Sequence, residues 1–279
     1  MKTSARPKEG LFLGLTFGLI VVLGTVFFFK KWLPDLASDR VEIDHLFYTI
    51  LIMTGIVFIL VQGITGYFIW RYSDPTPERA VYLSHSRSLE ITWTTVTALL
   101  MLALGVWGLS LWKNVTTGNA PSKALAVEIT GQQFQWNIRY PGPDSKFGRV
   151  DPHLISDDNA LGLDPKDKAS KDDVVVQDDL YLVVNRPAIV TLRSKDVIHS
   201  FFLPNFRVKQ DAVPGMSIDT WFTPTKIGDY EIACAQFCGL GHYTMRGMVH
   251  VLSQEQFDQK MKELGHVSYQ HHLLTLKGE

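Results

Sequence analysis

The chain has 279 residues, 46% of them hydrophobic, and a formal net charge of −1 from 27 basic and 28 acidic side chains. This length allows one or two domains with sizeable cores, and the composition excludes a disordered chain and a basic nucleic-acid-binding protein. The sequence contains two cysteines, which excludes a disulfide-dense scaffold and a protein with several zinc sites.

The first part of the chain is predicted to be a membrane anchor over residues 1–113. Three long stretches in it carry no charge: Leu11–Phe29, Leu46–Trp70 and Ile91–Trp112. A membrane core of about 30 Å requires about 20 apolar helical residues, and backbone groups in lipid must be hydrogen-bonded within the helix. We therefore predict three membrane helices, at about residues 11–32, 45–71 and 90–112.

The first stretch has a second interpretation. Lys2, Arg6 and Lys8 followed by an apolar run are also typical of a signal peptide. The run is long for a signal peptide and no small-x-small cleavage site follows closely, so we predict a retained helix beside an antiparallel hairpin of two helices. Three crossings place the N-terminus and the C-terminal part on opposite sides of the membrane, while the basic residues of the connectors do not decide the orientation.

Residues 114–253 are predicted to form an all-β external domain. Short apolar runs separated by turn residues predict strands: Leu125–Thr130, Phe134–Tyr140, Tyr181–Val184, Ala188–Arg193, Phe201–Leu203, Thr220–Thr223, Gly228–Ile232 and Met248–Leu252. Their spacing indicates an antiparallel Greek-key sandwich. A polar insertion spans about residues 141–179, and its later part has eight Asp against three Lys, so it is either a solvated loop or a docking surface for a basic partner. A short helix over Gln254–Leu264 and a tail complete the chain at residues 254–279.

One short segment carries the chemistry. Both cysteines lie in the segment Cys234–Met245, together with His242, and His199 precedes a predicted strand. A disulfide gives no role to His242 or Met245, and zinc does not use a thioether. Thiolate, thioether and imidazole together suit copper. A mononuclear electron-transfer site needs one cysteine, whereas two bridging cysteines can hold two copper ions.

From about Ser84 to Val251 the chain resembles subunit II of haem-copper cytochrome c oxidases, whose external domain is a cupredoxin with the dinuclear copper centre CuA. Four segments carry the resemblance: 194–201, 201–204, 209–216 and the loop 234–245. The resemblance implies a helical membrane anchor followed by an all-β cupredoxin sandwich.

The resemblance also implies roles for particular residues. The copper ligands would be His199, Cys234, Cys238, His242, Met245 and the backbone carbonyl of Gln236. Asp196, Lys209 and Asp211 would lie beside these ligands. Phe134 stands where the family has its electron-accepting tryptophan, and Trp136 is the next aromatic residue. Glu90, flanked by His85, Leu89, Trp93 and Thr94, matches the glutamate at the mouth of a proton path into subunit I.

Three features depart from the family pattern. Gln236 replaces a common glutamate that binds magnesium through its carboxylate, so this position offers no charged ligand for a magnesium ion at the subunit I interface. Phe134 replaces tryptophan, which leaves the electron donor open. The first helix is additional to the family's usual two.

The predicted function is that of subunit II of a terminal oxidase. Its CuA centre would accept electrons from cytochrome c, or from another haem c protein, and pass them to haem in subunit I, where dioxygen is reduced. The chain has no haem-attaching Cys-x-x-Cys-His, so the donor haem would belong to another chain or subunit. We expect a multi-pass protein of the cell (inner or plasma) membrane, with the CuA domain on the outer, periplasmic side, contacting other oxidase subunits and the lipid bilayer but no nucleic acid.

Three alternatives remain at this stage. The domain could serve a different respiratory reductase, but the fused helices and Glu90 argue against that. A membrane-tethered copper carrier or assembly factor would not need His199 and Met245 fixed from opposite ends of the domain. A quinol-oxidase subunit without metal would not need the intact ligand set.

Overall fold

The structure is a computed structural model that describes residues 8–28, 30–73, 82, 84–116, 121, 123–156 and 159–275, with side chains to residue 265. The chain divides into two compact units. The helical unit comprises Met1–Trp32 and Glu42–Leu111, and the β unit comprises Leu33–Val41 and Trp112–Glu279.

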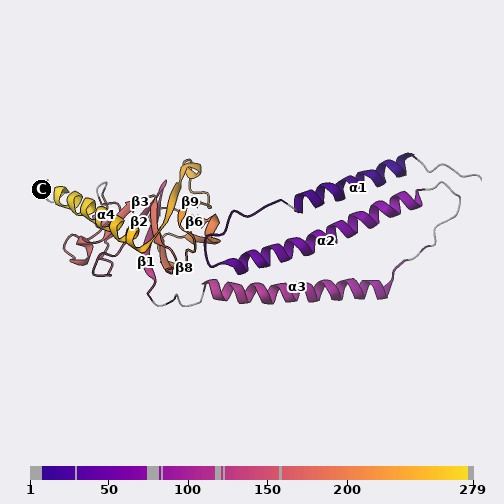
Figure 1. Ribbon diagram of the computed structural model, residues 1–279, viewed down its shortest axis with the longest axis horizontal. Coiled ribbons are helices and arrows are strands. Elements are labelled where there is room, and N and C mark those ends of the chain that lie inside the picture. The colour runs from indigo at the N-terminus through magenta and orange to yellow at the C-terminus, as the bar shows by residue number, and fades with distance from the viewer. Residues whose placement is uncertain are drawn as a thin grey trace, which may run out of the picture. The chain divides into compact units, whose positions relative to one another are not determined.

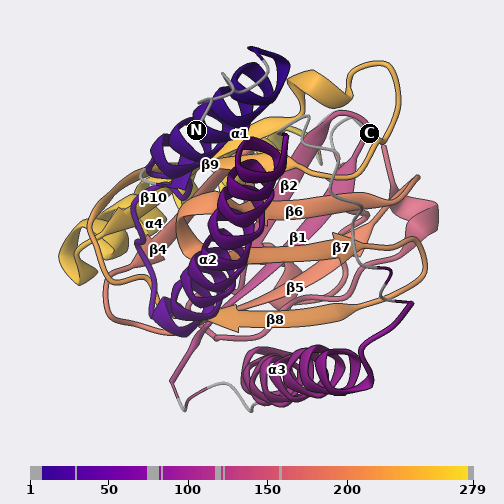
Figure 2. The ribbon, with the colours of Figure 1, turned by 90° about the vertical axis from the view of Figure 1, so that its right-hand side faces the viewer.

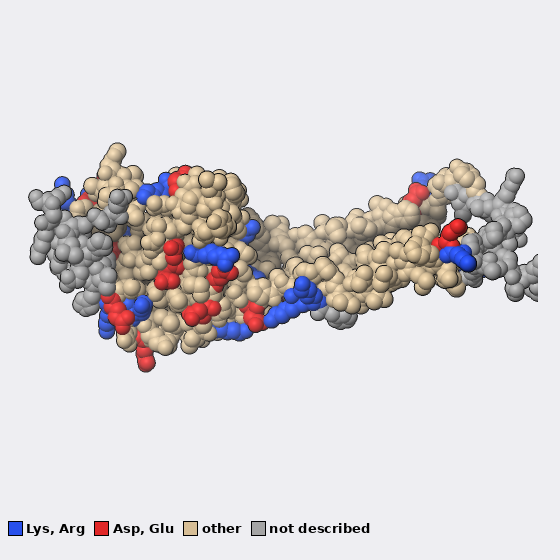
Figure 3. Space-filling model, turned by 90° about the horizontal axis from the view of Figure 1, so that it is seen from above, with Lys and Arg blue, Asp and Glu red and all other residues tan. Residues whose placement is uncertain are grey.

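The helical unit contains the three predicted helices. They are α1 (Lys8–Phe28), α2 (Val41–Tyr72) and α3 (Arg87–Thr116) (Figure 1). All three are long and apolar enough to cross a membrane, which confirms the prediction of three apolar helices. In Figure 3 the surface of the helices is free of charged side chains along most of its length, with charge gathered near the ends. Helix α1 ends at Phe28, earlier than predicted, whereas α2 and α3 extend past their apolar stretches at both ends, because polar residues at a membrane surface can continue a helix.

Glycines bring α1 close to α2. A Cβ atom on Gly24 would lie 2.6 Å from the Phe58 ring, and one on Gly55 would lie 2.8 Å from the Phe28 ring. Where lipid is as apolar as the side chains, such close packing is what holds helices together. Helix α1, the one additional to the family's usual two, therefore packs along α2 in the antiparallel direction.

The β unit consists mainly of two five-stranded sheets (Figure 2). The first has the order β3 (Val174–Gln177), β2 (Gln135–Tyr140), β1 (Leu125–Gln132), β5 (Ala188–Ser194) and β8 (Ile218–Phe222). The second has the order β4 (Asp179–Val183), β10 (Arg246–Leu252), β9 (Gly228–Cys234), β6 (His199–Leu203) and β7 (Val208–Ala212). The inward-facing side chains of both sheets form one core that includes Trp136, Leu192 and Phe201, all with 0% exposure.

The strands differ from the prediction in two respects. Each of the eight predicted runs overlaps an observed strand, but β3 and β7 were not predicted, because β3 is short and lies among aspartates and β7 carries charged residues. The sandwich is also not purely antiparallel: β1 pairs with β5 and β4 pairs with β10 in parallel. Each parallel pair joins strands that are distant in sequence, a connection that the pattern of apolar runs does not reveal.

The connector between α1 and α2 belongs to the β unit. The backbone N–H of Ala37 donates to the carbonyl of Asn205, and Thr225 N–H donates to the carbonyl of Ala37, both at 2.8 Å. The hydroxyl of Ser38 donates to the carbonyl of Phe206 at 2.8 Å. The connector is therefore part of the β unit, together with the residues from Trp112 onward.

Helix α4 (Gln254–Thr275) follows the last strand. Ser253 begins it: its hydroxyl accepts from Gln256 N–H at 3.2 Å, and the Gln256 side chain accepts from Ser253 N–H at 3.1 Å. This reciprocal pair is a capping box. Phe257 is buried against Tyr140, with 6.2 Å between ring centroids, so the first turns of α4 close the core, and the helical backbone continues beyond the predicted Leu264.

Candidate metal centre

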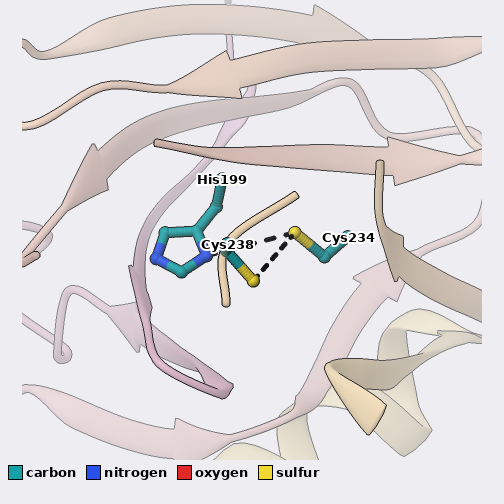
Figure 4. A group of neighbouring side chains, drawn as sticks. All are labelled: His199, Cys234 and Cys238. Atoms are coloured by element: carbon teal, nitrogen blue, oxygen red, sulfur yellow. Dashed lines mark hydrogen bonds between the residues drawn. The ribbon is translucent and has the colours of Figure 1, made fainter. Parts of the chain in front are cut away.

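Strand pairing brings the predicted ligands together. His199 is the first residue of β6 and Cys234 is the last residue of β9, and these antiparallel strands are neighbours in register at Phe201 and Cys234. The loop after Cys234 carries Cys238 and leads to Met245, immediately before β10. Figure 4 shows the imidazole of His199 and the two thiols gathered at one place.

The donor atoms form two similar halves. The Sγ atom of Cys234 lies 4.0 Å from His199 Nδ1 and 3.2 Å from the carbonyl oxygen of Gln236. The Sγ atom of Cys238 lies 3.6 Å from His242 Nδ1 and 3.7 Å from Met245 Sδ. The two Sγ atoms are 3.8 Å apart, far more than the about 2.05 Å of a disulfide. Each thiol thus has one imidazole nitrogen and one weaker donor beside it.

Most of the donor side chains are removed from solvent. The exposed fraction is 0% for His199, 1% for Met245, 3% for Cys238 and 9% for Cys234. His242 is half-buried, and the side chain of Gln236 is exposed while its carbonyl points at Cys234. A dry set of sulfur and imidazole donors has the chemistry that copper prefers.

Asp196 orients the buried histidine. Its Oδ1 atom lies 2.8 Å from His199 Nε2, while Nδ1 of the same ring faces Cys234. A hydrogen bond from Nε2–H to this carboxylate leaves the lone pair of Nδ1 directed at the thiols. Partial burial alone would raise the pKa of Asp196, but hydrogen bonds from Gln133 N–H, His199 and Val197 N–H lower it, so the carboxylate is held charged.

The pKa values of the two thiols are shifted in opposite directions. Burial raises the pKa of the Cys234 thiol, but its interaction with the His199 imidazole and hydrogen bonds with neighbouring groups bring that pKa below its ordinary value. Burial and the nearby Cys234 thiolate raise the pKa of Cys238. The pair holds one negative charge readily and a second only where positive charge compensates it, as a bound metal cation does.

The two aromatic residues predicted for electron uptake lie in different surroundings. Phe134 is in the turn between β1 and β2 and is 36% exposed. Its ring covers the loop of residues 234–245, called the metal loop below, since a Cβ atom on Gly239 would lie 3.1 Å from Phe134 Cζ. Trp136 has 0% exposure and lies inside the core, with its ring centroid 5.9 Å from that of His199. Of the two, Phe134 is the residue that is exposed to solvent, and the role of both in electron uptake stays a prediction.

Other predicted residues lie farther from the donor set. Lys209 and Asp211 are exposed on β7, and the Lys209 ammonium lies 5.8 Å from the centroid of the Phe202 ring. Within the described part of the chain, no hydrogen bond or ion pair joins either side chain to a donor residue, so their role beside the ligands stays a prediction. Glu90 is exposed in the first turn of α3, where its backbone N–H donates to the carbonyl of Ser86 at 2.9 Å, and its role in a proton path also stays a prediction.

Sequence reasoning missed several residues that shape the site. Gly131 is required for space, because a Cβ atom there would lie 2.8 Å from His199 Cδ2. Asp178 accepts the backbone N–H of Trp136 at 2.7 Å. Gln133 contacts both Asp196 and the metal loop. The one available signal was the glycine inside the strand β1, which marks close approach of another group to the backbone.

The polar insertion begins at the other end of β2. Phe134 precedes this strand and the insertion follows Tyr140, so a strand of six residues, about 20 Å long, separates them. Arg139 binds the insertion through Asp173 Oδ2 at 2.5 Å and through the carbonyl of Gly148. The insertion therefore starts away from the exposed aromatic residue and is folded onto the sandwich, while docking of a basic partner on its later, acidic part stays a prediction.

Comparisons with known proteins place the chain in one family. The family profile for the cytochrome c oxidase subunit II periplasmic domain matches residues 125–252, and the profile for the transmembrane domain matches residues 28–111. The chain is 35% identical over 243 residues to an alternative cytochrome c oxidase subunit 2 of Bradyrhizobium diazoefficiens, covering 86% of this chain and 87% of that protein. It is 28% identical over 233 residues to cytochrome c oxidase subunit 2 of Cereibacter sphaeroides, covering 80% and 76%.

Among solved structures, the periplasmic domain of subunit II of cytochrome oxidase from Bradyrhizobium japonicum is 28% identical. The match covers 52% of this chain and 96% of that one, with a TM-score of 0.39. The two family profiles cover both the helical and the β unit, and the relative from Bradyrhizobium diazoefficiens matches along nearly its whole length. The chain belongs to the cytochrome c oxidase subunit II family, whose members are subunits of oxidoreductase complexes.

Proposed function

We propose that this protein holds a dinuclear copper centre and accepts electrons through it for a haem-copper oxidase. The ligands are His199, Cys234, Cys238, His242, Met245 and the backbone carbonyl of Gln236. The observation that carries the proposal is the matched surroundings of the two thiols, each with one imidazole nitrogen and one weaker donor within 4.0 Å. When bound, the copper pair supplies a reversible one-electron couple.

The donor set favours copper over the alternatives. A separation of 3.8 Å leaves the thiols free as ligands and excludes a disulfide in this conformation. A structural zinc site of two cysteines and two histidines would leave Met245 Sδ, 3.7 Å from Cys238 Sγ, without a role. A carrier with a labile mononuclear site would need fewer donors and easier access than this buried set provides.

The protein's own residues perform three tasks in this proposal. The buried thiols and His199 exclude water, so that little has to reorganise when charge changes. Asp196 keeps His199 in the tautomer that leaves Nδ1 free. Phe134 offers an exposed aromatic surface in contact with the loop between Cys238 and His242, and there a donor protein can approach closely.

The donor is proposed to be cytochrome c or another haem c protein, and the recipient the haem of subunit I. The sequence has two cysteines, both in the metal loop, and therefore no haem-attachment site of its own. We place the β unit on the outer, periplasmic side of the cell membrane, with the N-terminus and the connector between α2 and α3 inside.

The proposal is tested by the copper content and electron paramagnetic resonance spectrum of the purified full-length chain in detergent. We expect two copper ions per chain that share one unpaired electron. In Cys238→Ser the shared signal should disappear, because one of the two thiols is lost while the volume of the side chain changes little.

A matched control is Met216→Ser, which replaces a sulfur-containing side chain outside the site, at an exposed residue of the turn after β7. This variant should keep both copper ions and the shared signal. One copper ion, zinc, or no metal in the reconstituted wild-type chain would contradict the proposal, as would a shared signal that survives Cys238→Ser.

A further inference from the structure

The turn between β1 and β2 is attached to both halves of the donor set through one residue, Gln133. Its backbone N–H donates to Asp196 Oδ2 at 2.7 Å, and Oδ1 of the same carboxylate lies 2.8 Å from His199 Nε2. Its side-chain Nε2 donates to the carbonyl oxygen of Cys238 at 2.6 Å. One residue thus connects the His199 half and the Cys238 half.

The residue that follows is Phe134, which gives these two hydrogen bonds a functional consequence. The Gln133 amide lies against Gly239, where a Cβ atom would be 2.8 Å from Nε2, and the Phe134 ring rests on Gly239 and Gly241. An exposed turn of two residues has little apolar burial of its own to fix an aromatic ring, so its position depends on such local bonds.

We infer that Gln133 is a positioning residue for electron uptake, which holds the Phe134 ring against the metal loop through its bond to the Cys238 carbonyl. This inference rests on the proposed function. The bond also supplies a short covalent and hydrogen-bonded connection from Phe134 to Cys238, and the backbone bond to Asp196 supplies a second one to His199.

Two hydrogen bonds of Lys195 support the positioning role of Gln133. Lys195 N–H donates to the carbonyl of Gly131 at 3.0 Å, and Lys195 Nζ donates to Gln132 Oε1 at 3.1 Å. The segment before Gln133 is therefore already tied to the segment that carries Asp196. The side chain of Gln133 adds the connection to the metal loop. The side chain of Gln132 instead accepts hydrogen bonds from Asn137 and Lys195.

The test compares Gln133→Met with Gln135→Met in the full-length chain. Both substitutions replace a glutamine beside Phe134 by a side chain of similar length without a donor. Gln135 bonds Asn137 at 3.2 Å and Gln177 at 2.6 Å, away from the metal loop. In the copper-free chain, Gln133→Met should raise amide hydrogen exchange of residues 131–134 about fivefold, the factor that corresponds to one lost hydrogen bond. Gln135→Met should leave the exchange of these residues unchanged.

In the copper-loaded chain, reduction by a small c-type cytochrome should slow severalfold in Gln133→Met, as in Phe134→Ala. Reduction by hexaammineruthenium, a small donor that needs no docking surface, and the copper spectrum should stay as in wild type. Wild-type exchange and cytochrome kinetics in Gln133→Met would overturn the inference, and so would loss of the copper spectrum, which would make Gln133 a support of the ligands instead. The exchange measurement needs no metal. A chain that bound no copper would contradict the proposed function, but hydrogen exchange would still show whether Gln133 holds the turn at residues 131–134.

Discussion

At the scale of single residues, Asp196 determines which ring nitrogen of His199 faces the thiols. His199 is fully buried, and its ring could present either nitrogen to the thiols. The contact of 2.8 Å between Nε2 and Asp196 selects Nδ1. Asp196 is itself fixed by the backbone N–H groups of Gln133 and Val197, both at 2.7 Å. The orientation of the His199 ring therefore depends on two segments of the chain, the turn at Gln133 and residues 196–199.

Asp196→Asn is expected to weaken copper binding. The amide carries no charge to stabilise the Nε2–H tautomer, and loss of such a partner typically reduces metal affinity about 10- to 100-fold. Competition with a copper chelator measures the change. Asp219→Asn is the control, because this exposed carboxylate bonds the Thr191 hydroxyl on β5. Equal copper affinities of the two variants would contradict the role given to Asp196.

At the scale of elements, a buried arginine attaches the insertion to the first sheet. Arg139 of β2 is 1% exposed and contacts Asp173 and Glu128, whose side chains are 0% and 8% exposed. Gly148 N–H also donates to Asp173 Oδ2, at 3.0 Å. The segment that the sequence suggested as a solvated loop thus has a charged internal anchor, and it returns to the sheet as β3.

Arg139→Met is expected to lower the free energy of unfolding of the β unit by about 3–5 kcal/mol, because the buried Asp173 and Glu128 carboxylates lose their contacts with the buried guanidinium. Arg193→Met should cost about 0–1 kcal/mol, since Arg193 is 43% exposed although it also pairs with Glu128. Urea unfolding followed by tryptophan fluorescence measures both. Similar costs for the two variants would show that the Arg139 cluster is not an anchor.

At the scale of the whole molecule, the connector between α1 and α2 belongs to the β unit and not to the helical unit. Asp39 N–H donates to the carbonyl of Thr223 at 3.1 Å, and Arg40 lies with its guanidinium 4.5 Å from the centroid of the Trp221 ring while donating to the carbonyl of that residue. Burial lowers the pKa of Arg40. The connector is therefore held on the β unit, and an anchor of three crossings would place both on one side of the membrane.

An epitope tag at the N-terminus is accordingly expected to be protected from protease added to spheroplasts, while a tag at the C-terminus is digested. Digestion of both tags would mean that α1 does not cross the membrane. Digestion of the N-terminal tag alone would mean that the orientation is reversed. Permeabilised cells, in which both tags are digested, serve as the control.

Much of the site was predictable because its donors are local in sequence. Five of the six proposed ligand positions, Cys234, Gln236, Cys238, His242 and Met245, fall within twelve residues, and the donor types restrict the metal. The three helices were predictable because lipid demands long apolar segments. Gln133 and Asp178 were not, since a polar side chain in a turn has no pattern that indicates its partner, and Asp178 lies 42 residues from the backbone N–H that it accepts.

The sequence by itself determined the membrane anchor, the β-rich domain and the chemical nature of the centre, because composition and short-range spacing express solvation and ligand preference directly. The tertiary structure decided the rest: the parallel strand pairs, the attachment of the connector to the β unit, and the difference between exposed Phe134 and buried Trp136. These features depend on contacts between distant segments. Such contacts are set by packing and hydrogen bonding in the folded chain, which no local pattern encodes.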